Sequence, residues 1–552
     1  MKKIWSTKWD TTSYYNEYPK NITKIFCKYN LSERKNFVKW IKQISLKFKE
    51  DLDWWISPPV SRNPYFSNLY KNICLIMTID ELLKKKSLPN LILVDSPSLK
   101  KTIKKIFNKE NLKIEVKNKK LFNLMYFKNV KDIIFYSIQF IIIKILTSKQ
   151  VICKNKLILI DTYIIDFNLR EKIYYGDLSF QAKDKKNIYF VPTIIKKSFF
   201  DFIHIVRNLS KKKNYIFKEN LLTGSDFFYG IFYIFRKSKF LSNFKKYKSY
   251  DLSLIINDEI KNNKDLYSVL LSLANFNFVK RLKINNFKID KAVNWFENQA
   301  MDKGWNYGFR KFYEKIELIG YQGFIPFPEY MCLSPTKFEE DNHVIPKKIV
   351  LIGNSYKNIY KEFFPNLKII IGPALRFADL FQKKPMIKKK YDVVLFLEGV
   401  NENRDLQIIK NLIRINKNFT NTNFFIKSHP ISLINLCSIN LPNNFQSINS
   451  NLSDIACNTN IAICYGSSSS ILETLSYGCK LIIPYDNLSD RKNFKNFQIN
   501  KNFYRICSND KMLIDSINNF KKSNIHHTST KINILKNNLF NKVTKKNIKI
   551  FL

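Results

Sequence analysis

One histidine follows a predicted strand and is the residue best placed to bind a phosphate. Lys427, Ser428, His429 and Pro430 come directly after the apolar run 423–426. Ligands of α/β proteins bind at the carboxyl ends of strands, and a basic side chain beside free backbone amides forms an anion site. Pro430 suits the first turn of a following helix. We predict that His429 and Lys427 contact a phosphate, although a His-Pro pair can also merely cap or pack.

A run of serines follows another predicted strand, at 461–465. Gly466 precedes four serines that open a predicted helix: Ser467, Ser468, Ser469 and Ser470. Glycine lets the backbone approach a ligand closely, and hydroxyls with free amides at a helix start bind phosphate. The spacing from Ser470 to Glu473 also fits a capping box, in which Glu473 is structural. Glu473 could instead accept hydrogen bonds from a ribose, and both alternatives stay open.

A carboxylate in the segment 290–313 is the candidate general base. We expect this segment to be a helix, on which Glu297 and Asn298 suit a cleft wall better than a core face. A carboxylate that faces a cleft can take the proton of an incoming hydroxyl; a solvated Glu on an amphipathic helix is the alternative. Trp295 and Trp305 flank Glu297 in the sequence, and each is either a core residue or part of a wall on which a sugar stacks.

Weaker candidates occupy turns beside predicted strands. Gly353, Asn354, Gly372 and Glu398 each follow a predicted strand, where they would line a donor cleft or simply form turns. The candidates for the acceptor side, besides Asn298, are Asp177, Gln299 and Gln322.

The elements that position these residues alternate short β-branched runs with longer periodic segments. This pattern predicts βα units around parallel sheets. Strands of a first series are predicted at 91–95, 112–116, 156–161, 187–191 and 316–320. Strands of a second series are predicted at 349–352, 368–371, 392–397, 423–426, 461–465 and 480–484. Two successive Rossmann-like halves place a ligand cleft at the carboxyl ends of their strands.

This pattern predicts an α/β protein of five parts. The parts are a helical N-terminal region at 1–90, a Rossmann-like acceptor domain at 91–333, a linker at 334–346, a Rossmann-like donor domain at 347–522 and a basic tail at 523–552. We expect the tail to be either a helix that packs back or a loose arm.

The charge of the 552-residue chain points to anionic partners. There are 93 Lys and Arg against 45 Asp and Glu, a formal net charge of +48. Such a field attracts nucleic acid, anionic lipid or anionic substrates. Only 12 of the basic residues are Arg, the residue that makes two-pronged contacts with bases and phosphates. RRM, KH, helix-turn-helix and zinc-finger patterns are absent from the sequence. We therefore expect an anionic membrane surface, and no nucleic acid, as a partner.

Cysteine usage and the N-terminal sequence indicate a cytoplasmic protein. The nine cysteines are scattered without a C-x-x-C pair, which is typical of reduced thiols in the cytosol. The first residues lack the apolar core of a signal peptide. The most apolar segment, 133–146, is too short to span a bilayer. It predicts a buried helix or, with Lys131, Lys144 and Lys149 nearby, a helix that lies in a membrane surface.

Two motifs together resemble the donor half of GT-B glycosyltransferases that make bacterial surface polysaccharides. They are K-x-H-P at 427–430 and the serine cluster that is followed by Glu473 on the next helix. That group includes Kdo, sialic-acid and polysialic-acid transferases and CDP-glycerol glycerophosphotransferases. The F-E-N-Q stretch at 296–299, the Y-G-D-L turn at 175–178 and the G-Y-Q-G strand end at 320–323 look similar to a bacterial family of capsule and O-antigen biosynthesis proteins. The resemblance covers roughly 156–506.

This resemblance implies a GT-B fold in which two Rossmann-like domains face each other across a cleft. It also implies that His429, Ser468 and Ser469 hold the donor phosphate, with the nucleotide-sugar as co-substrate and without a metal or cofactor. Bacterial sialyltransferases carry an acidic base motif before a glycine in their first domain. Here the similar Glu398-Gly399 lies in the second half and lacks the first acid, so Glu297 remains our candidate base.

We therefore predict a metal-independent glycosyltransferase. It would move a sugar from a nucleotide-sugar, a CMP-sugar among the candidates, to a surface polysaccharide or lipid-linked glycan at the inner face of the cytoplasmic membrane. The alternatives within enzymes are a glycerophosphate or other phospho-polyol transferase and a nucleotide-sugar 2-epimerase. The alternatives outside enzymes are a basic nucleic-acid-binding protein and a non-catalytic scaffold.

Overall fold

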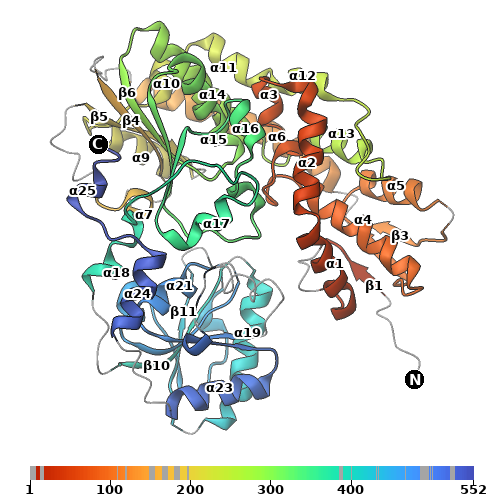
Figure 1. Cartoon of the computed structure of the whole chain (residues 1–552), viewed down its shortest axis with the longest axis vertical. Helices are drawn as coiled ribbons and strands as arrows, with labels where there is room; N and C mark the ends of the chain where they lie inside the picture. The colour runs from red at the N-terminus through yellow and green to blue at the C-terminus, as the bar shows by residue number, and fades with distance from the viewer. Residues whose placement is uncertain are drawn as a thin grey trace.

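The computed structural model shows three parts: a mostly helical N-terminal part and two domains that each contain a six-stranded parallel sheet (Figure 1). The structure describes residues 8–12, 18–108, 110–117, 121–147, 156–164, 172–178, 187–195, 198–383, 389–399, 401–419, 421–429, 432, 434–466, 468–484, 497, 499, 501–522 and 529–552.

The N-terminal part surrounds a small parallel sheet of its own. Its main helices are α1 (Lys20–Ser32), α2 (Arg34–Ser45), α4 (Leu69–Lys84) and α5 (Pro97–Ile106). Its sheet has the order β1-β2-β3, with β1 at Lys8–Asp10, β2 at Leu91–Val94 and β3 at Ile114–Val116. The expectation that the strands at 91–95 and 112–116 open the first large sheet is wrong, because β2 pairs with β1 and β3.

The first large sheet has the strand order β5-β4-β6-β7-β8-β9. Its strands are β4 (Leu157–Ile164), β5 (Ile188–Ile194), β6 (Ile289–Trp295), β7 (Glu317–Gln322), β8 (Lys348–Leu351) and β9 (Ile369–Ile371). Every residue of β4 and β5 is buried, as expected for parallel strands covered on both faces. Alternate residues of β4 enter two different cores: Leu159 packs in the core that contains α14 (Leu266–Ile284), and Ile160 in the core that contains α9 (Phe199–Ser210).

Two sequence predictions fail in this sheet. The segment 290–313 is not one helix, because β6 occupies its start and α15 (Ala300–Phe312) its end. The strands predicted at 349–352 and 368–371 do not belong to the second sheet, because β8 pairs with β7 and β9 pairs with β8. The chain therefore passes to the second sheet after β9, and the expected linker at 334–346 precedes β8 and contains the short helix α16 (Lys337–Asp341).

The second large sheet has the strand order β12-β11-β10-β13-β14-β15. Its strands are β10 (Tyr391–Phe396), β11 (Phe424–Lys427), β12 (Phe445–Ser447), β13 (Thr459–Ile463), β14 (Lys480–Pro484) and β15 (Tyr504–Cys507). Counted along the chain this is 3-2-1-4-5-6, the strand order of Rossmann folds. One face packs on α19 (Glu402–Ile415) and α23 (Asp510–Lys522), and the other on α21 (Ser470–Ser476).

The C-terminal segment returns to the first domain. Helix α24 (Ser529–Leu539) packs against α21. Beyond it, the backbone N–H of Asn541 donates to the carbonyl of Ile352, and Phe551 makes an edge-to-face contact with Tyr321 at 4.9 Å between ring centroids. Figure 1 shows this blue segment rising from the lower domain to the C-terminus beside the upper one. Of the two expectations for the tail, a helix that packs back is therefore the one the structure shows.

The sheet topology confirms an α/β protein with two Rossmann-like domains after a mostly helical N-terminal part. In the part of the chain that the structure describes, no helix combines the length and the apolar character needed to cross a membrane.

Candidate functional site

Both groups of candidate residues lie where the strand order of a parallel sheet reverses. In the second sheet the reversal is between β10 and β13, and Glu398 and Gly466 follow these two strands. In the first sheet it is between β4 and β6, and Glu297 comes two residues after the end of β6. Open α/β sheets bind ligands in the crevice outside the carboxyl ends of strands at such a switch point. The topology thus gives each domain one favoured binding edge, and a candidate residue lies at each.

At the edge of the second sheet, the loop after β10 touches both the loop after β11 and the loop after β13. Gly399, after β10, and Gly466, after β13, have φ values of 75° and 69°, in the left-handed region that glycine adopts without penalty. A Cβ atom on Gly399 would lie 2.5 Å from Cβ of His429, and one on Gly466 would lie 2.1 Å from a carboxylate oxygen of Glu398. The sequence-predicted residues Glu398, His429 and Gly466 are therefore neighbours.

His429 sits in an electrostatic setting that favours the neutral form of its imidazole. Burial lowers its pKa below the usual 6.5; the charge of Asp405 opposes the shift, and the charges of Arg376 and Lys427 add to it. Asp405 is fully buried and accepts hydrogen bonds from the Gly399 N–H at 3.0 Å and the Tyr465 hydroxyl at 2.5 Å. A neutral imidazole still carries one N–H, which can donate to a phosphate oxygen.

The serine cluster is organised around Glu473 in a way the sequence did not predict. The helix N-cap is Ser469, whose hydroxyl donates to Oε1 of Glu473 at 2.7 Å. The hydroxyls of Ser468 and Ser470 lie 2.8 Å apart. The predicted capping box from Ser470 to Glu473 is wrong, because Ser470 already lies inside α21. Burial raises the pKa of Glu473, and the Ser469 hydrogen bond and the charge of Arg376 oppose this. Ser467 lies outside the described residues, as does Pro430.

Glu297 is held by hydrogen bonds on both carboxylate oxygens. Trp295 Nε1 donates to Oε1 at 2.8 Å, and Gln299 Nε2 donates to Oε2 at 2.5 Å. The backbone N–H groups of Glu297 and Gln299 both donate to Oδ2 of Asp302, which fixes the turn between β6 and α15. Burial raises the pKa of Glu297 above 4.5, while its two hydrogen bonds and the charge of Arg376 oppose the shift. Such a carboxylate suits a general base, because catalytic pKa values lie close to the working pH.

Neighbours of Glu297 in sequence prove to be structural. Asn298 is 3% exposed, and its amide donates to the Cys332 carbonyl at 2.9 Å and accepts from Lys303 Nζ at 3.3 Å. It is packed into the interior and does not form a cleft wall, so its prediction as an acceptor-side residue is wrong. Trp295 and Trp305 are 1% and 0% exposed, which makes them core residues and not a wall for a stacked sugar.

The structure adds Arg376, a residue that sequence reasoning missed. The loop that carries it, after β9, is fixed by distant segments: Leu375 N–H donates to the Tyr321 hydroxyl at 3.1 Å, and Ala374 N–H donates to the Asn541 carbonyl at 2.8 Å. Gly176, with φ 55°, packs so closely that a Cβ there would lie 2.4 Å from the Leu375 carbonyl oxygen. The position of Arg376 therefore depends on contacts among four segments that are far apart in sequence.

The charge of Arg376 reaches candidate residues of both domains. It is exposed, and within the described ranges its guanidinium has no ion-pair partner. It lowers the pKa values of Glu297, on the first sheet, and of Glu473 and His429, on the second. An arginine so placed can meet a ligand anion that lies between the two switch points.

The remaining predicted residues are packing glycines, exposed residues and one buried glutamine. Gly353 and Gly372 are packing positions: a Cβ on Gly353 would lie 2.1 Å from the Leu539 carbonyl oxygen, and one on Gly372 would lie 2.3 Å from Val350. These contacts explain both glycines without a ligand. Asn354 and Asp177 are exposed, and Asp177 adjoins the turn that touches the Arg376 loop. Gln322, at the end of β7, is 1% exposed, and neither polar atom of its side chain has a hydrogen-bond partner among the residues that the structure describes.

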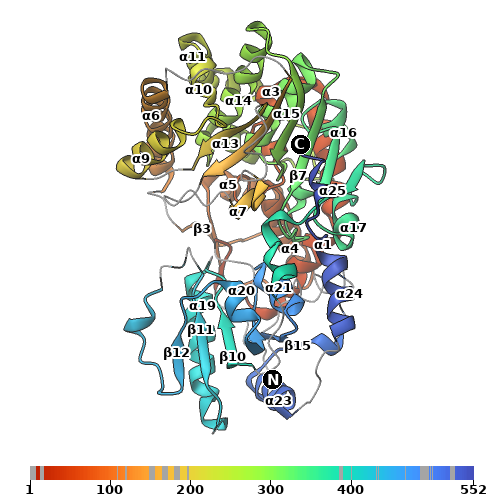
Figure 2. The same ribbon diagram turned by 90° about the vertical axis from the view of Figure 1, so that its left-hand side faces the viewer.

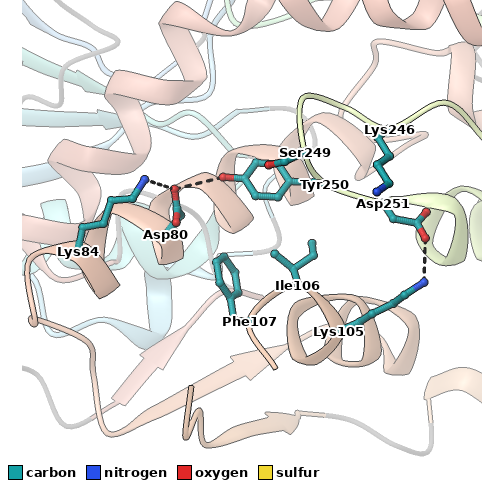
Figure 3. Close-up of a pocket in the computed structure, with 9 residues that line it drawn as sticks. All are labelled: Asp80, Lys84, Lys105, Ile106, Phe107, Lys246, Ser249, Tyr250 and Asp251. Atoms are coloured by element: carbon teal, nitrogen blue, oxygen red, sulfur yellow. Dashed lines mark hydrogen bonds and ion pairs between the residues drawn. The ribbon is translucent and has the colours of Figure 1, made fainter. Parts of the chain in front are cut away.

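An open hollow of about 520 Å³ lies elsewhere, between α4, α5 and the loop that precedes α13 (Ser253–Lys261) (Figure 3). Its charged side chains are largely paired: Lys84 with Asp80 at 2.7 Å and Lys105 with Asp251 at 2.9 Å. The Lys105 hydrogen bond lowers the pKa of Asp251 to about 2. Because the hollow belongs to the N-terminal part and lies at no switch point, we do not assign the candidate site to it. Among the described residues, no group of three or more His, Cys, Asp or Glu side chains could hold a metal ion.

Comparisons with known proteins give only distant likeness. No family model matches the chain, and no curated protein matches it. Solved structures with some likeness include UGT89C1 of Arabidopsis thaliana complexed with quercetin (10% identity, 71% of this chain, 97% of that chain, TM-score 0.42). Another is UDP-GlcNAc 2-epimerase of Neisseria meningitidis bound to UDP-GlcNAc (13% identity, 68% of this chain, 94% of that chain, TM-score 0.40). A third is the glycotransferase of kitacinnamycin (10% identity, 70% of this chain, 95% of that chain, TM-score 0.39). Likeness at this level does not assign an activity to the chain.

Proposed function

We propose that the protein is a glycosyltransferase that moves a sugar from a nucleotide-sugar to a glycan acceptor. The observation that carries this proposal is the meeting of the three loops at the edge of the second sheet, where His429, Glu398 and Gly466 are neighbours. A switch-point edge with a histidine and several hydroxyls suits the phosphates of a nucleotide. Glu297 at the corresponding edge of the first sheet supplies the second requirement of transfer, a base for the acceptor.

The proposed step exchanges one bond at the anomeric carbon of the sugar. The acceptor oxygen forms a bond to this carbon while its proton goes to Glu297. The bond from the anomeric carbon to the phosphate oxygen breaks, and its electron pair stays on that oxygen. His429, Lys427 and Arg376, with the hydroxyls of the Ser468–Ser470 cluster, would stabilise the charge on the departing nucleotide. Preorganised donors and cations of this kind supply much of the catalysis in such reactions.

The finer features of the proposal concern the substrates and the place of reaction. We propose a CMP-sugar as one candidate donor and a surface polysaccharide or lipid-linked glycan as acceptor. The reaction would then take place at the inner face of the cytoplasmic membrane, to which the chain, with its formal charge of +48, is attracted.

The test of the proposal is transfer from radiolabelled nucleotide-sugars by the wild-type protein and by His429→Ala. We expect the variant to lose roughly 10- to 100-fold in kcat/KM, since a hydrogen bond to a charged group contributes about 1.5–3 kcal/mol. His204→Ala, which changes an exposed histidine on α9, is the matched control.

Three outcomes would contradict the proposal. Unchanged transfer by His429→Ala would remove the histidine from the site. Transfer of label from CDP-glycerol but from no nucleotide-sugar would identify a glycerophosphate transferase instead. Release of a modified sugar without any acceptor would identify an epimerase.

A further inference from the structure

Helix α6 (Leu121–Thr147) exposes an apolar stripe along its length. The stripe consists of Phe127, Val130, Ile134, Ile138, Ile141 and Ile145, with exposed fractions between 39% and 69%. Their spacing of three and four residues places them on one face of the helix. Single exposed apolar side chains are ordinary, but a continuous row of them marks an interaction surface.

Of the polar side chains within the apolar part of α6, Gln139 and Lys144 face the protein, and Ser137, beside the stripe, donates its hydroxyl to the carbonyl of Ile133 in the same helix at 2.8 Å. Gln139 is buried and accepts a hydrogen bond from the hydroxyl of Tyr267. Lys144 donates to the backbone carbonyl of Leu222. The inner face of α6 packs on α14 and α9, so Gln139 and Lys144, the two longest polar side chains of this stretch, belong to the protein side. The outer face is therefore more apolar than the sequence of the helix suggests.

Two neighbouring segments add exposed phenylalanines. Phe199 and Phe200, at the start of α9, are 53% and 80% exposed. Phe232, between α11 (Gly224–Ile231) and α12 (Tyr233–Arg236), is in ring contact with Phe228 on α11 and with Phe235 on α12. Helix α9 packs on α6, and α11 joins α6 through contacts of Phe227 with Tyr136 and Phe140. Figure 2 shows α6, α9 and α11 at one edge of the upper domain. We call these eleven exposed residues the apolar edge.

The charges beside the apolar edge identify its occupant. Lys128 and Lys131 on α6, Arg207 on α9 and Lys211 just after it are exposed. The carboxylates of the same elements are turned inward or engaged: Asp132 is 1% exposed, Asp226 is paired with Arg281, and the partly exposed Asp201 accepts a hydrogen bond from the Ser198 hydroxyl at 2.7 Å. Apolar side chains with phenylalanines, bordered by lysines, are typical of helices that lie in the surface of an anionic bilayer. A second copy of the chain would instead meet the same excess of positive charge.

We propose that the apolar edge inserts into the headgroup region of an anionic bilayer, with α6 lying in the plane of the membrane. This inference rests on the proposed place of reaction at a membrane and is independent of the transfer chemistry. It supplies the proposed enzyme with a defined lipid-facing surface on its first domain, the domain that also carries Glu297.

The test is co-sedimentation of the full chain with vesicles of phosphatidylcholine, with and without phosphatidylglycerol. We expect the wild-type protein to bind the vesicles that contain phosphatidylglycerol. Ile141→Glu/Ile145→Glu should reduce the partition coefficient roughly tenfold or more, since each change removes a large apolar side chain from the lipid. Lys128→Glu/Lys131→Glu should reduce binding only to the anionic vesicles. Ile534→Glu, at a 58% exposed position on α24, is the matched control.

Further measurements separate this inference from the proposed function. If the isoleucine variants unfold in a circular-dichroism melt, Phe232→Ser/Phe235→Ser replaces them and should show the same loss. The inference would be overturned if the wild-type protein bound neither kind of vesicle, or if the variants bound the vesicles as strongly as the wild type. So would a wild-type dimer that the same variants convert to a monomer in size-exclusion chromatography. Transfer to a water-soluble acceptor should be unchanged in these variants, so its absence in the wild type would contradict the transferase proposal alone.

Discussion

Replacing Arg376 by alanine is expected to lower kcat/KM for sugar transfer by about 10²–10³-fold, the usual loss when one preorganised donor to a developing anion is removed. The side chain is exposed, so the fold should withstand the change. The kcat/KM of Arg376→Lys should lie between those of the wild type and Arg376→Ala, since lysine keeps the charge but loses the planar two-pronged donor. Arg414→Ala, at an exposed arginine on α19 that pairs with Asp510, is the matched control.

The pH profile of Arg376→Ala offers a readout that a loss of stability would not produce. The arginine charge lowers the pKa of Glu297. Removing the arginine should therefore raise the pKa of this carboxyl, and the acid limb of the rate profile should move to higher pH. An unchanged limb would show that Arg376 and Glu297 do not share one site.

Glu297→Gln is expected to lower the transfer rate by roughly 10²–10⁴-fold, the range ascribed to a general base. Nucleotide binding should remain, because the proposed donor site lies on the other domain. In the wild type, burial raises the pKa of Glu297 above 4.5. The basic form is thus lost as the pH falls through this raised pKa, and the rate should fall with it.

This acid limb should be absent from Glu297→Gln and present in Glu314→Gln, which changes an exposed carboxylate beyond the end of α15. Asp302 is the informative rival, because burial raises its pKa to about 8. A limb that persists near that pH in Glu297→Gln, with a substantial rate, would assign the base to Asp302 and contradict the role of Glu297.

The residues at the edge of the second sheet could be predicted from the sequence because each one closely follows its own strand. His429, Glu398 and Gly466 each follow a clear apolar strand, and the carboxyl ends of parallel strands meet at one edge. The predicted strands at 392–397, 423–426, 461–465 and 480–484 agree with β10, β11, β13 and β14 to within two residues at each end. What was needed was the position of each residue relative to its own strand.

Other features depend on contacts between distant segments and could not be predicted in that way. Strand β6 contains Asp290, Lys291 and Asn294, which interrupt its apolar pattern and made the segment look helical. Strands β8 and β9 are recognisable as strands, but only the pairing of β8 with β7 and of β9 with β8 decides their sheet. Arg376 stands in an ordinary loop, and its position depends on Tyr321, Gly176 and Asn541.

The measurement that tests the proposed nucleotide site most directly is thermal unfolding of the wild-type protein and His429→Ala with CMP, UDP and GDP. A ligand that binds only the folded state raises Tm, and the rise grows with the logarithm of the ligand concentration relative to its Kd. We predict that one nucleotide raises Tm of the wild type and has a clearly smaller effect on the variant. A panel in which no nucleotide shifts the wild type, or in which both proteins shift equally, would contradict a donor site at His429.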